Sequence, residues 1–348
     1  MSEMTPMERF EAALRGEEPD RVPVMFMALM ICAREINVGM REYAKDAEKL
    51  ARGQLAFFEK YKPDVITPGT NVCMTAEAFG TKTKFHEGLT LPVTEEYAVK
   101  KPEDWEKLEV PDPKRAGRRS VYLGAVEIIS ERLKDVPIMG FIISPLTLAS
   151  WVADLSRVVV DMRKNPDLLH KGLRTLTDAV KARIETSIDA GVTHFMLVCT
   201  RASRELFKEE QYAEFGMPYD LEVLSHAVKR KVPIIAHVCG VEPLLDLIIT
   251  KYPVMGVNWW DRGTRFSLKD VKGKYGITVI GGVDQNRTLI MGTPEDVERE
   301  AADAIKKAAP GGRFILSAGC ELPAIAPPEN IKAVVHAAEK YGRYPVKG

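Results

Sequence analysis

Eight apolar segments of strand length alternate with helical segments along this chain, which predicts an α/β fold and, more specifically, a (β/α)₈ TIM barrel. Several apolar segments are almost uninterrupted, as is typical of parallel strands covered on both faces. The length of 348 residues suits either two ordinary domains or one large barrel, and the alternation favours a single domain over residues 1–348. The expected strands are residues 22–27, 64–67, 136–143, 193–198, 232–239, 256–260, 277–283 and 314–318.

A helix is expected before the first strand. Thr5 can cap it, Pro6 takes the first helical position, and Glu8 completes a capping box. This helix should run to Gly16. The helices expected between the strands carry apolar residues three and four positions apart and cover residues 46–60, 119–133, 166–190, 208–229, 241–251, 294–309 and 328–341.

Residues 79–112 interrupt the alternation, and we interpret them as an insertion after the second strand. Residues 85–93 are typical of a short hairpin, and one helical turn is expected within residues 101–113. The insertion is expected to cover part of the barrel mouth. A doubly wound open sheet is the alternative fold, but it requires a glycine-rich phosphate loop after the first strand, where this chain has Ala28-Leu29-Met30-Ile31.

Composition excludes several functional classes. The 49 basic and 49 acidic residues cancel, so no overall field attracts nucleic acid or an anionic membrane. No apolar run approaches the roughly 18 residues of a membrane span, and the amino terminus lacks the pattern of a signal peptide. Five scattered cysteines indicate a reducing interior. We therefore expect a cytoplasmic enzyme without nucleic-acid or membrane partners; its oligomeric state is left open, a homo-oligomer included.

One histidine and two cysteines at strand ends are the strongest candidates for chemistry. His237 and Cys239 end the fifth expected strand, and Cys320 follows the eighth. One imidazole and two thiols are ligands typical of zinc, and three protein ligands leave the fourth position of a catalytic site open. Spacing alone is equally compatible with small buried thiols and a core histidine. Because the active sites of barrels lie at the carboxyl ends of the strands, the fold favours zinc.

Other residues after strands are weaker candidates. Asp261 follows the sixth strand and Asp284 the seventh, so either could act in catalysis, as a fourth metal ligand, or as an acceptor for the ring N–H of the histidine. Each could equally be a helix cap or part of a loop salt bridge. Cys199, Trp259 and Trp260 are candidates for the substrate pocket, although adjacent strand residues point to opposite sides, so one tryptophan is expected to pack beneath a helix. The motifs G-x-S-x-G and H-E-x-x-H are absent.

Three stretches of the chain resemble one known family. Residues 7–23, the motif His237-Val238-Cys239-Gly240 and the closing residues 317–330 are similar to the uroporphyrinogen decarboxylase superfamily, and more narrowly to its zinc-dependent branch of methylcobamide:coenzyme M methyltransferases and related corrinoid-linked enzymes. The resemblance runs nearly end to end. It implies a (β/α)₈ barrel whose zinc is bound by His237, Cys239 and Cys320. The decarboxylase proper is a poorer match, because its arginine-rich segment corresponds to residues 26–35, with one arginine here.

The resemblance also implies an activity and a partner. A methyl group would move between a small substrate and the cobalt of a corrinoid carried by a separate protein, since this chain lacks a D-x-H-x-x-G corrinoid motif. The coenzyme M enzymes usually carry Asp-Pro after strand four, where this chain has Cys199-Thr200, and they lack the tryptophans at 259 and 260. Because of these departures, the sequence supports a methoxylated aromatic donor and a thiol acceptor such as coenzyme M about equally. The alternatives are a metal-free decarboxylase or lyase, and a non-catalytic relative that binds a corrinoid protein.

Overall fold

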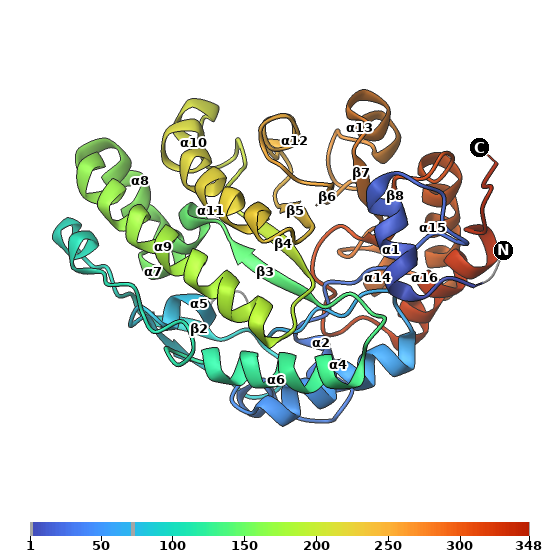
Figure 1. Ribbon diagram of the computed structural model, residues 1–348, viewed down its shortest axis with the longest axis horizontal. Helices are drawn as coiled ribbons and strands as arrows, with labels where there is room; N and C mark the ends of the chain where they lie inside the picture. The colour runs from blue at the N-terminus through green and yellow to red at the C-terminus, as the bar shows by residue number, and fades with distance from the viewer. Residues whose placement is uncertain (1–2, 71–73, 348) are drawn as a thin grey trace.

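The computed structural model describes residues 3–70 and 74–347 and contains a parallel sheet whose six strands lie side by side in chain order (Figure 1). Helices surround this sheet on its outside, which confirms the predicted α/β fold. The third to eighth expected strands are all present, although most are shorter than predicted. They are β3 (Met139–Ile143), β4 (His194–Cys199), β5 (Ile234–Val238), β6 (Gly256–Trp259), β7 (Thr278–Val283) and β8 (Phe314–Ala318).

The first two expected strands are corrected by the structure, which has only isolated bridges there. Val24 forms a parallel bridge with Leu316 of β8, and Ile66 forms one with Ile138 just before β3. The backbone N–H of Asp64 donates to Val24 O at 2.8 Å, so the two segments also contact each other. A regular ladder is missing because Pro23 has no N–H and the Asp64 carboxylate, rather than a carbonyl, accepts the Val24 N–H at 2.7 Å. The segments nevertheless extend both edges of the sheet, as strands one and two of a (β/α)₈ fold would.

The expected helices lie near their predicted positions, but one of them is divided in two and another begins later than predicted. The expected helix 208–229 is divided into α10 and α11, because Gly216 and Pro218 interrupt it. The expected helix 241–251 begins only at Leu245, after Pro243. The larger helices are α1 (Pro6–Arg15), α4 (Ala47–Tyr61), α6 (Arg119–Arg132), α7 (Pro145–Val152), α8 (Leu155–Lys164), α9 (Pro166–Ala190), α11 (Met217–Lys229), α13 (Leu268–Tyr275), α15 (Pro294–Ala308) and α16 (Pro328–Tyr341). The shorter ones are α2 (Ile31–Arg34), α3 (Met40–Tyr43), α5 (Met74–Glu77), α10 (Glu209–Phe215), α12 (Leu245–Lys251) and α14 (Thr288–Met291).

The amino-terminal helix α1 begins with the predicted capping box. Thr5 accepts from the Glu8 backbone N–H, and the Glu8 side chain accepts from the Thr5 N–H. The buried guanidinium of Arg9 then joins α1 to Asp20 and Asp64, with both nearest N···O distances at 2.6 Å. Helix α1 is thereby fixed to the two bridged segments. None of the helices within the described residues is long and apolar enough to cross a membrane.

The insertion contains the two predicted features. Its hairpin pairs β1 (Lys82–Lys84) with β2 (Val93–Glu96), and its helical turn is a 3-10 helix over Pro102–Lys107. Trp105 of this turn is fully buried, and its indole N–H donates to the Asp161 carboxylate of α8 at 2.8 Å. Gly172 of α9 lies beneath the ring, and a Cβ there would be 2.5 Å from it. The second half of the insertion therefore packs on the outer helices α8 and α9.

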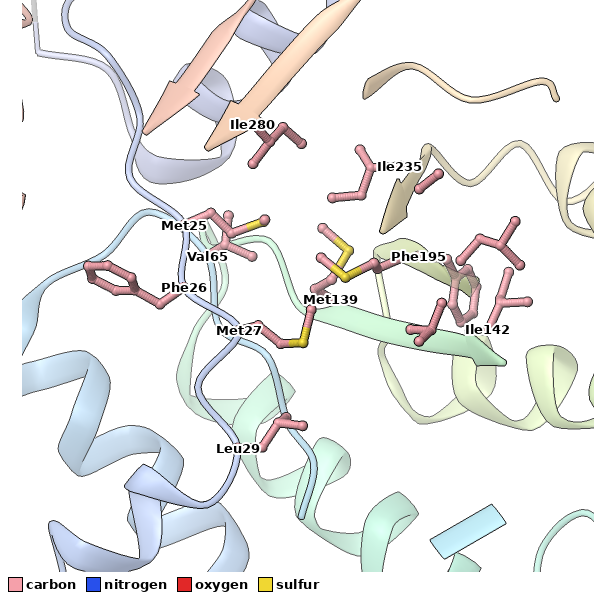
Figure 2. Packing of buried hydrophobic residues seen from close by; sticks show 14 of the residues in the cluster. Met25, Phe26, Met27, Leu29, Val65, Met139, Ile142, Phe195, Ile235 and Ile280 are labelled. Carbon is pink, nitrogen blue, oxygen red and sulfur yellow. The ribbon is translucent and has the colours of Figure 1, made fainter. Parts of the chain in front are cut away.

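The strands enclose an apolar interior, and the side chains that meet there show which positions of each strand point inward. Figure 2 shows Met25, Met139, Ile235 and Ile280, from four separate segments, converging on one space. A Cβ on Gly256 would lie 3.3 Å from both Ile235 Cγ2 and Ile280 Cδ1, so these side chains meet across three strands. Because side chains alternate along a strand, positions two residues further on also face inward.

Candidate metal centre

His237, Cys239 and Cys320 meet at the ends of β5 and β8, where their ligand atoms all lie within 4.8 Å of one another. His237 Nε2 is 2.8 Å from Cys239 Sγ and 3.7 Å from Cys320 Sγ. Within residues 3–70 and 74–347, this is the only group of three or more His, Cys, Asp or Glu residues that is so compact. The structure thus brings the three predicted ligands within reach of one ion; that this ion is zinc stays a prediction.

Strand geometry and two glycines bring these side chains together. His237 is two residues beyond Ile235 and therefore points inward, and it is 2% exposed. Gly240, directly after Cys239, has a φ of 103°, a conformation that favours glycine. A Cβ on Gly319, directly before Cys320, would lie 2.6 Å from the Cα atom of Trp260. Both cysteines keep partial exposure, so the ligand group remains open to a substrate.

Asn258 of β6 fixes the tautomer of His237. Its side-chain NH₂ donates to Ile280 O at 2.9 Å and to Ala318 O at 3.0 Å, so its Oδ1 must face the histidine. This oxygen lies 2.6 Å from His237 Nδ1, which must therefore carry the proton. The lone pair of Nε2 is left facing the two thiols. This is the arrangement in which an outer hydrogen bond orients a metal-binding imidazole. We did not predict Asn258, although a lone asparagine within an apolar strand is a recognisable signal.

The electrostatics of the group favour a thiolate at Cys320. Its pKa is lowered well below the usual value by a hydrogen bond from the Cys239 thiol and by the interaction with His237, which together outweigh burial. The pKa of Cys239 is raised by the same thiol pair and by burial. Burial lowers the pKa of His237, but Cys320 and Asn258 raise it by more. A thiolate is the form of cysteine that binds metals.

Two further polar side chains border the group and were not predicted. Glu321 follows Cys320, and its Oε1 accepts from the Met30 N–H at 3.3 Å. Burial and the Cys320 thiolate raise the pKa of Glu321 to about 8. Arg201 follows β4, donates from Nε to Ser150 Oγ at 2.7 Å, and exerts a lowering effect on the pKa of Cys239. Glu321 directly follows a ligand and Arg201 lies two residues after the end of β4, and this position is the signal that could have identified them.

Asp261 and Asp284 lie outside the ligand group, and both form hydrogen bonds within the loops after β6 and β7. Asp261 Oδ1 accepts from the Gly282 N–H at 3.0 Å, and burial raises the pKa of Asp261 to about 6. Asp284 Oδ1 accepts from the N–H groups of Asn286 and Arg287 at 2.8 and 3.2 Å. These contacts show that both aspartates hold the loops after the strands in place. A catalytic role for either aspartate stays a prediction.

The three predicted pocket residues are separated by the alternation of side chains. Cys199 is fully buried on the outer face of β4, where burial and Asp220 of α11 raise its pKa. Trp259 is also fully buried, and its indole N–H donates to Phe266 O at 3.0 Å on the outer side of β6. Only Trp260 is partly exposed at the strand ends, with its N–H 3.3 Å from Asp284 Oδ1. Of the three, only Trp260 can therefore contact a ligand beside the metal centre.

The chain is similar to known proteins over almost its whole length. The model of the family described as uroporphyrinogen decarboxylase (URO-D) matches residues 5–341. A methylcobamide:CoM methyltransferase of Methanosarcina acetivorans is 27% identical over 98% of this chain and 99% of its own, and a uroporphyrinogen decarboxylase of Anaeromyxobacter dehalogenans is 26% identical over 96% and 99%. The solved structure of a methyltransferase from Methanosarcina mazei superposes with a TM-score of 0.86 at 25% identity, over 97% of this chain and 99% of that one.

Proposed function

Because the chain belongs to the uroporphyrinogen decarboxylase family, we propose that it is a zinc-dependent methyltransferase that moves a methyl group between a small substrate and the cobalt of a separate corrinoid protein. The observation that carries this proposal is the compact group of His237, Cys239 and Cys320. Similarity to methyltransferases over almost the whole chain supports the same reaction class. A decarboxylation without metal would leave this group of ligands without a function.

The donor set fits zinc in its chemistry. Two thiols and one imidazole suit a borderline-soft ion better than magnesium or calcium. His237 presents Nε2 in the unprotonated form that a metal requires, because Asn258 holds the proton on Nδ1. Three protein ligands leave one position for a substrate. Bound zinc would supply Lewis acidity, which lowers the pKa of a substrate thiol or polarises an ether oxygen.

A thiol acceptor is the substrate class that we favour. Two of the four residues that favoured an aromatic donor, Cys199 and Trp259, face away from the metal centre and cannot select a substrate. Relatives that share this chain's length are named for transfer to CoM. The thiolate of coenzyme M would attack the methyl carbon, an S–C bond would form, the Co–C bond would break with its electron pair left on cobalt, and the thiol proton would go to solvent.

O-demethylation of a methoxylated aromatic substrate remains the second candidate, because the partly exposed ring of Trp260 offers a flat apolar surface. In either direction the corrinoid comes from a partner protein, which we propose docks over the carboxyl ends of the strands. In this position the cobalt can approach a substrate beside His237. Arg201 and Glu321 are the ionisable residues that border the same ligand group.

An assay with free methylcobalamin and coenzyme M under anaerobic conditions tests the proposal directly. We expect methylcobalamin to be consumed and an equal amount of methylated thiol to appear by mass spectrometry. Cys239→Ala should lose both zinc and transfer, whereas Cys199→Ala, which removes a buried thiol on the outer face of β4, should keep both. A wild-type protein that contains no zinc would return the chain to the metal-free decarboxylase or lyase class.

The substrate class is tested separately. If methyl groups move from a methoxylated aromatic compound to reduced cobalamin, but never from methylcobalamin to coenzyme M, the thiol assignment is wrong and the demethylase stands. A zinc-containing protein that transfers nothing in either direction, yet binds a corrinoid protein, would be the non-catalytic relative.

A further inference from the structure

A second charged site lies away from the metal centre, beside β3. A cavity of about 30 Å³ is enclosed between the segment after residue 67, β3 and the helices α6 and α9. This volume holds one or two groups of the size of a water molecule. One side is mostly apolar and the other carries two arginines. The described residues that line it are Leu29, Gly69, Met74, Phe141 and Ile143, the threonines Thr70 and Thr75, and Arg119, Tyr122 and Arg183.

The cavity exists because the second segment and β3 separate. Within the described residues, the last backbone hydrogen bond that joins them is that from Met139 N to Ile66 O at 2.9 Å. Met139 points inward (Figure 2). Phe141 and Ile143 follow it at intervals of two along β3 and therefore face the same side. A Cβ on Gly69 would lie 2.9 Å from Leu29 Cδ2 and 3.4 Å from Phe141 Cε2. The cavity thus borders the interior enclosed by the strands.

Arg119 has only neutral partners. It is 2% exposed, and its Nη2 donates to Arg183 O, Thr186 Oγ1 and Ser187 Oγ at 2.7, 2.8 and 2.7 Å. Its Nε donates to Pro113 O at 3.1 Å, and its guanidinium carbon lies 4.8 Å from the centre of the Tyr122 ring. These contacts hold the guanidinium in place without neutralising its charge.

Arg183 is the less satisfied of the two. Within the described residues its guanidinium has no hydrogen bond and no ion pair with a carboxylate. Burial and the charge of Arg119 lower the pKa of Arg183 to about 9, and burial lowers that of Arg119 to about 10. Arg119 is buried and Arg183 is partly buried, so two cations border one small cavity. Buried charges in folded proteins are normally paired, since an uncompensated one is costly.

We propose that this cavity binds one compact anionic group, either a halide ion or a carboxylate, between the guanidinium groups of Arg183 and Arg119. The charge of the group would neutralise the pair, and the apolar wall of Leu29 and Phe141 would exclude larger, strongly hydrated anions. The group would come from solution as a free anion, and the proposal is independent of the proposed function.

Thermal unfolding of the full-length protein tests the site without any assay of methyl transfer. At constant ionic strength, sodium bromide and sodium formate should raise the Tm saturably relative to sodium gluconate, by about 4 °C at a hundredfold excess over Kd. Arg183→Met should abolish this rise. Arg174→Met, on the same helix α9 but with a side chain that is 67% exposed, should retain it. Equal shifts in both variants, or no difference between the salts for the wild type, would overturn the proposal.

Diffraction from crystals grown in bromide provides a second measurement, which needs no variant. An anomalous peak beside Arg183 supports the site, and an empty cavity at a bromide concentration that saturates the Tm shift refutes it. The thermal and diffraction measurements need no methyl transfer, so a failure of the proposed function leaves this test unaffected.

Discussion

Replacement of Asn258 by alanine should weaken zinc binding through the orientation of His237. Asn258 is 1% exposed, and its three hydrogen bonds reach His237 Nδ1, Ile280 O and Ala318 O at 2.6, 2.9 and 3.0 Å. Without them, the imidazole can rotate and can place its proton on either nitrogen. Only one of these states presents the Nε2 lone pair to the metal.

The expected losses of zinc affinity and of stability follow from these contacts. Loss of an outer-shell partner of a metal-bound histidine typically reduces affinity tenfold to a hundredfold, which is about 1.4–2.7 kcal/mol. The buried carbonyls of Ile280 and Ala318 also lose a donor, at about 1 kcal/mol or more each. We therefore expect the free energy of unfolding of the metal-free protein to fall by about 2–4 kcal/mol, in addition to the weaker zinc affinity.

Competition with a chromophoric chelator measures the zinc affinity, and denaturant unfolding of the metal-free protein measures stability. Asn330→Ala is the matched control, because Asn330 is also 1% exposed and donates to two backbone carbonyls, Leu289 O and Gly292 O. This control should lose a similar amount of stability and keep its zinc affinity. A zinc affinity of Asn258→Ala within twofold of the wild type would refute the orienting role, as would equal losses of affinity in the two variants.

Three further outcomes are expected. Asp261→Ala should lower the free energy of unfolding by about 1–3 kcal/mol, since the buried Gly282 N–H loses its acceptor; unchanged turnover of the folded variant would exclude Asp261 from catalysis. Burial raises the pKa of Asp220 to about 6, above about 3.9 in the unfolded chain, so its contribution to stability is complete below pH 4 and is lost between pH 4 and 6. Asp220→Asn should therefore gain up to about 3 kcal/mol over the wild type between pH 4 and 7 in denaturant titrations, and a constant difference would contradict this. Gly319→Ala should displace Cys320 and weaken zinc binding in the chelator assay, whereas Gly273→Ala, with open space around its Cβ, should not.

The ligands of the candidate site could be predicted because their positions depend on local patterns. Apolar runs that end in glycine place His237, Cys239 and Cys320 at strand ends, and the carboxyl ends of parallel strands meet at one edge. The side-chain directions of Cys199 and Trp259 depend instead on the register between strands. Val198 pairs with His237, and His237 pairs with Asn258, so the residues that follow Val198 and Asn258 face outward. No sequence pattern that we used contains this pairing.

The first two expected strands failed for a different reason. Their apolar residues are buried as predicted, since Val24, Met25 and Val65 are almost fully covered. Hydrogen bonding, however, is taken over by side chains, because Asp64 accepts the Val24 N–H and Thr67 accepts the Ala28 N–H at 3.0 Å. Burial is visible in hydrophobic patterns, whereas such exchanges of backbone for side-chain partners are not. The division between α10 and α11 was visible in Gly216 and Pro218 and was overlooked.

The contacts of Asn258 also bear on whether the metal centre exists before the metal binds. This side chain lies on β6, receives its orientation from carbonyls of β7 and β8, and directs a histidine of β5. Four neighbouring strands are thus joined through one amide, and none of these bonds requires an ion. The glycines at 240 and 319 likewise place their adjacent thiols through backbone geometry alone. Zinc fingers fold only with their metal. Here the strands supply the arrangement of the ligands without an ion, so the zinc that we propose for this site would not be needed to fold the chain.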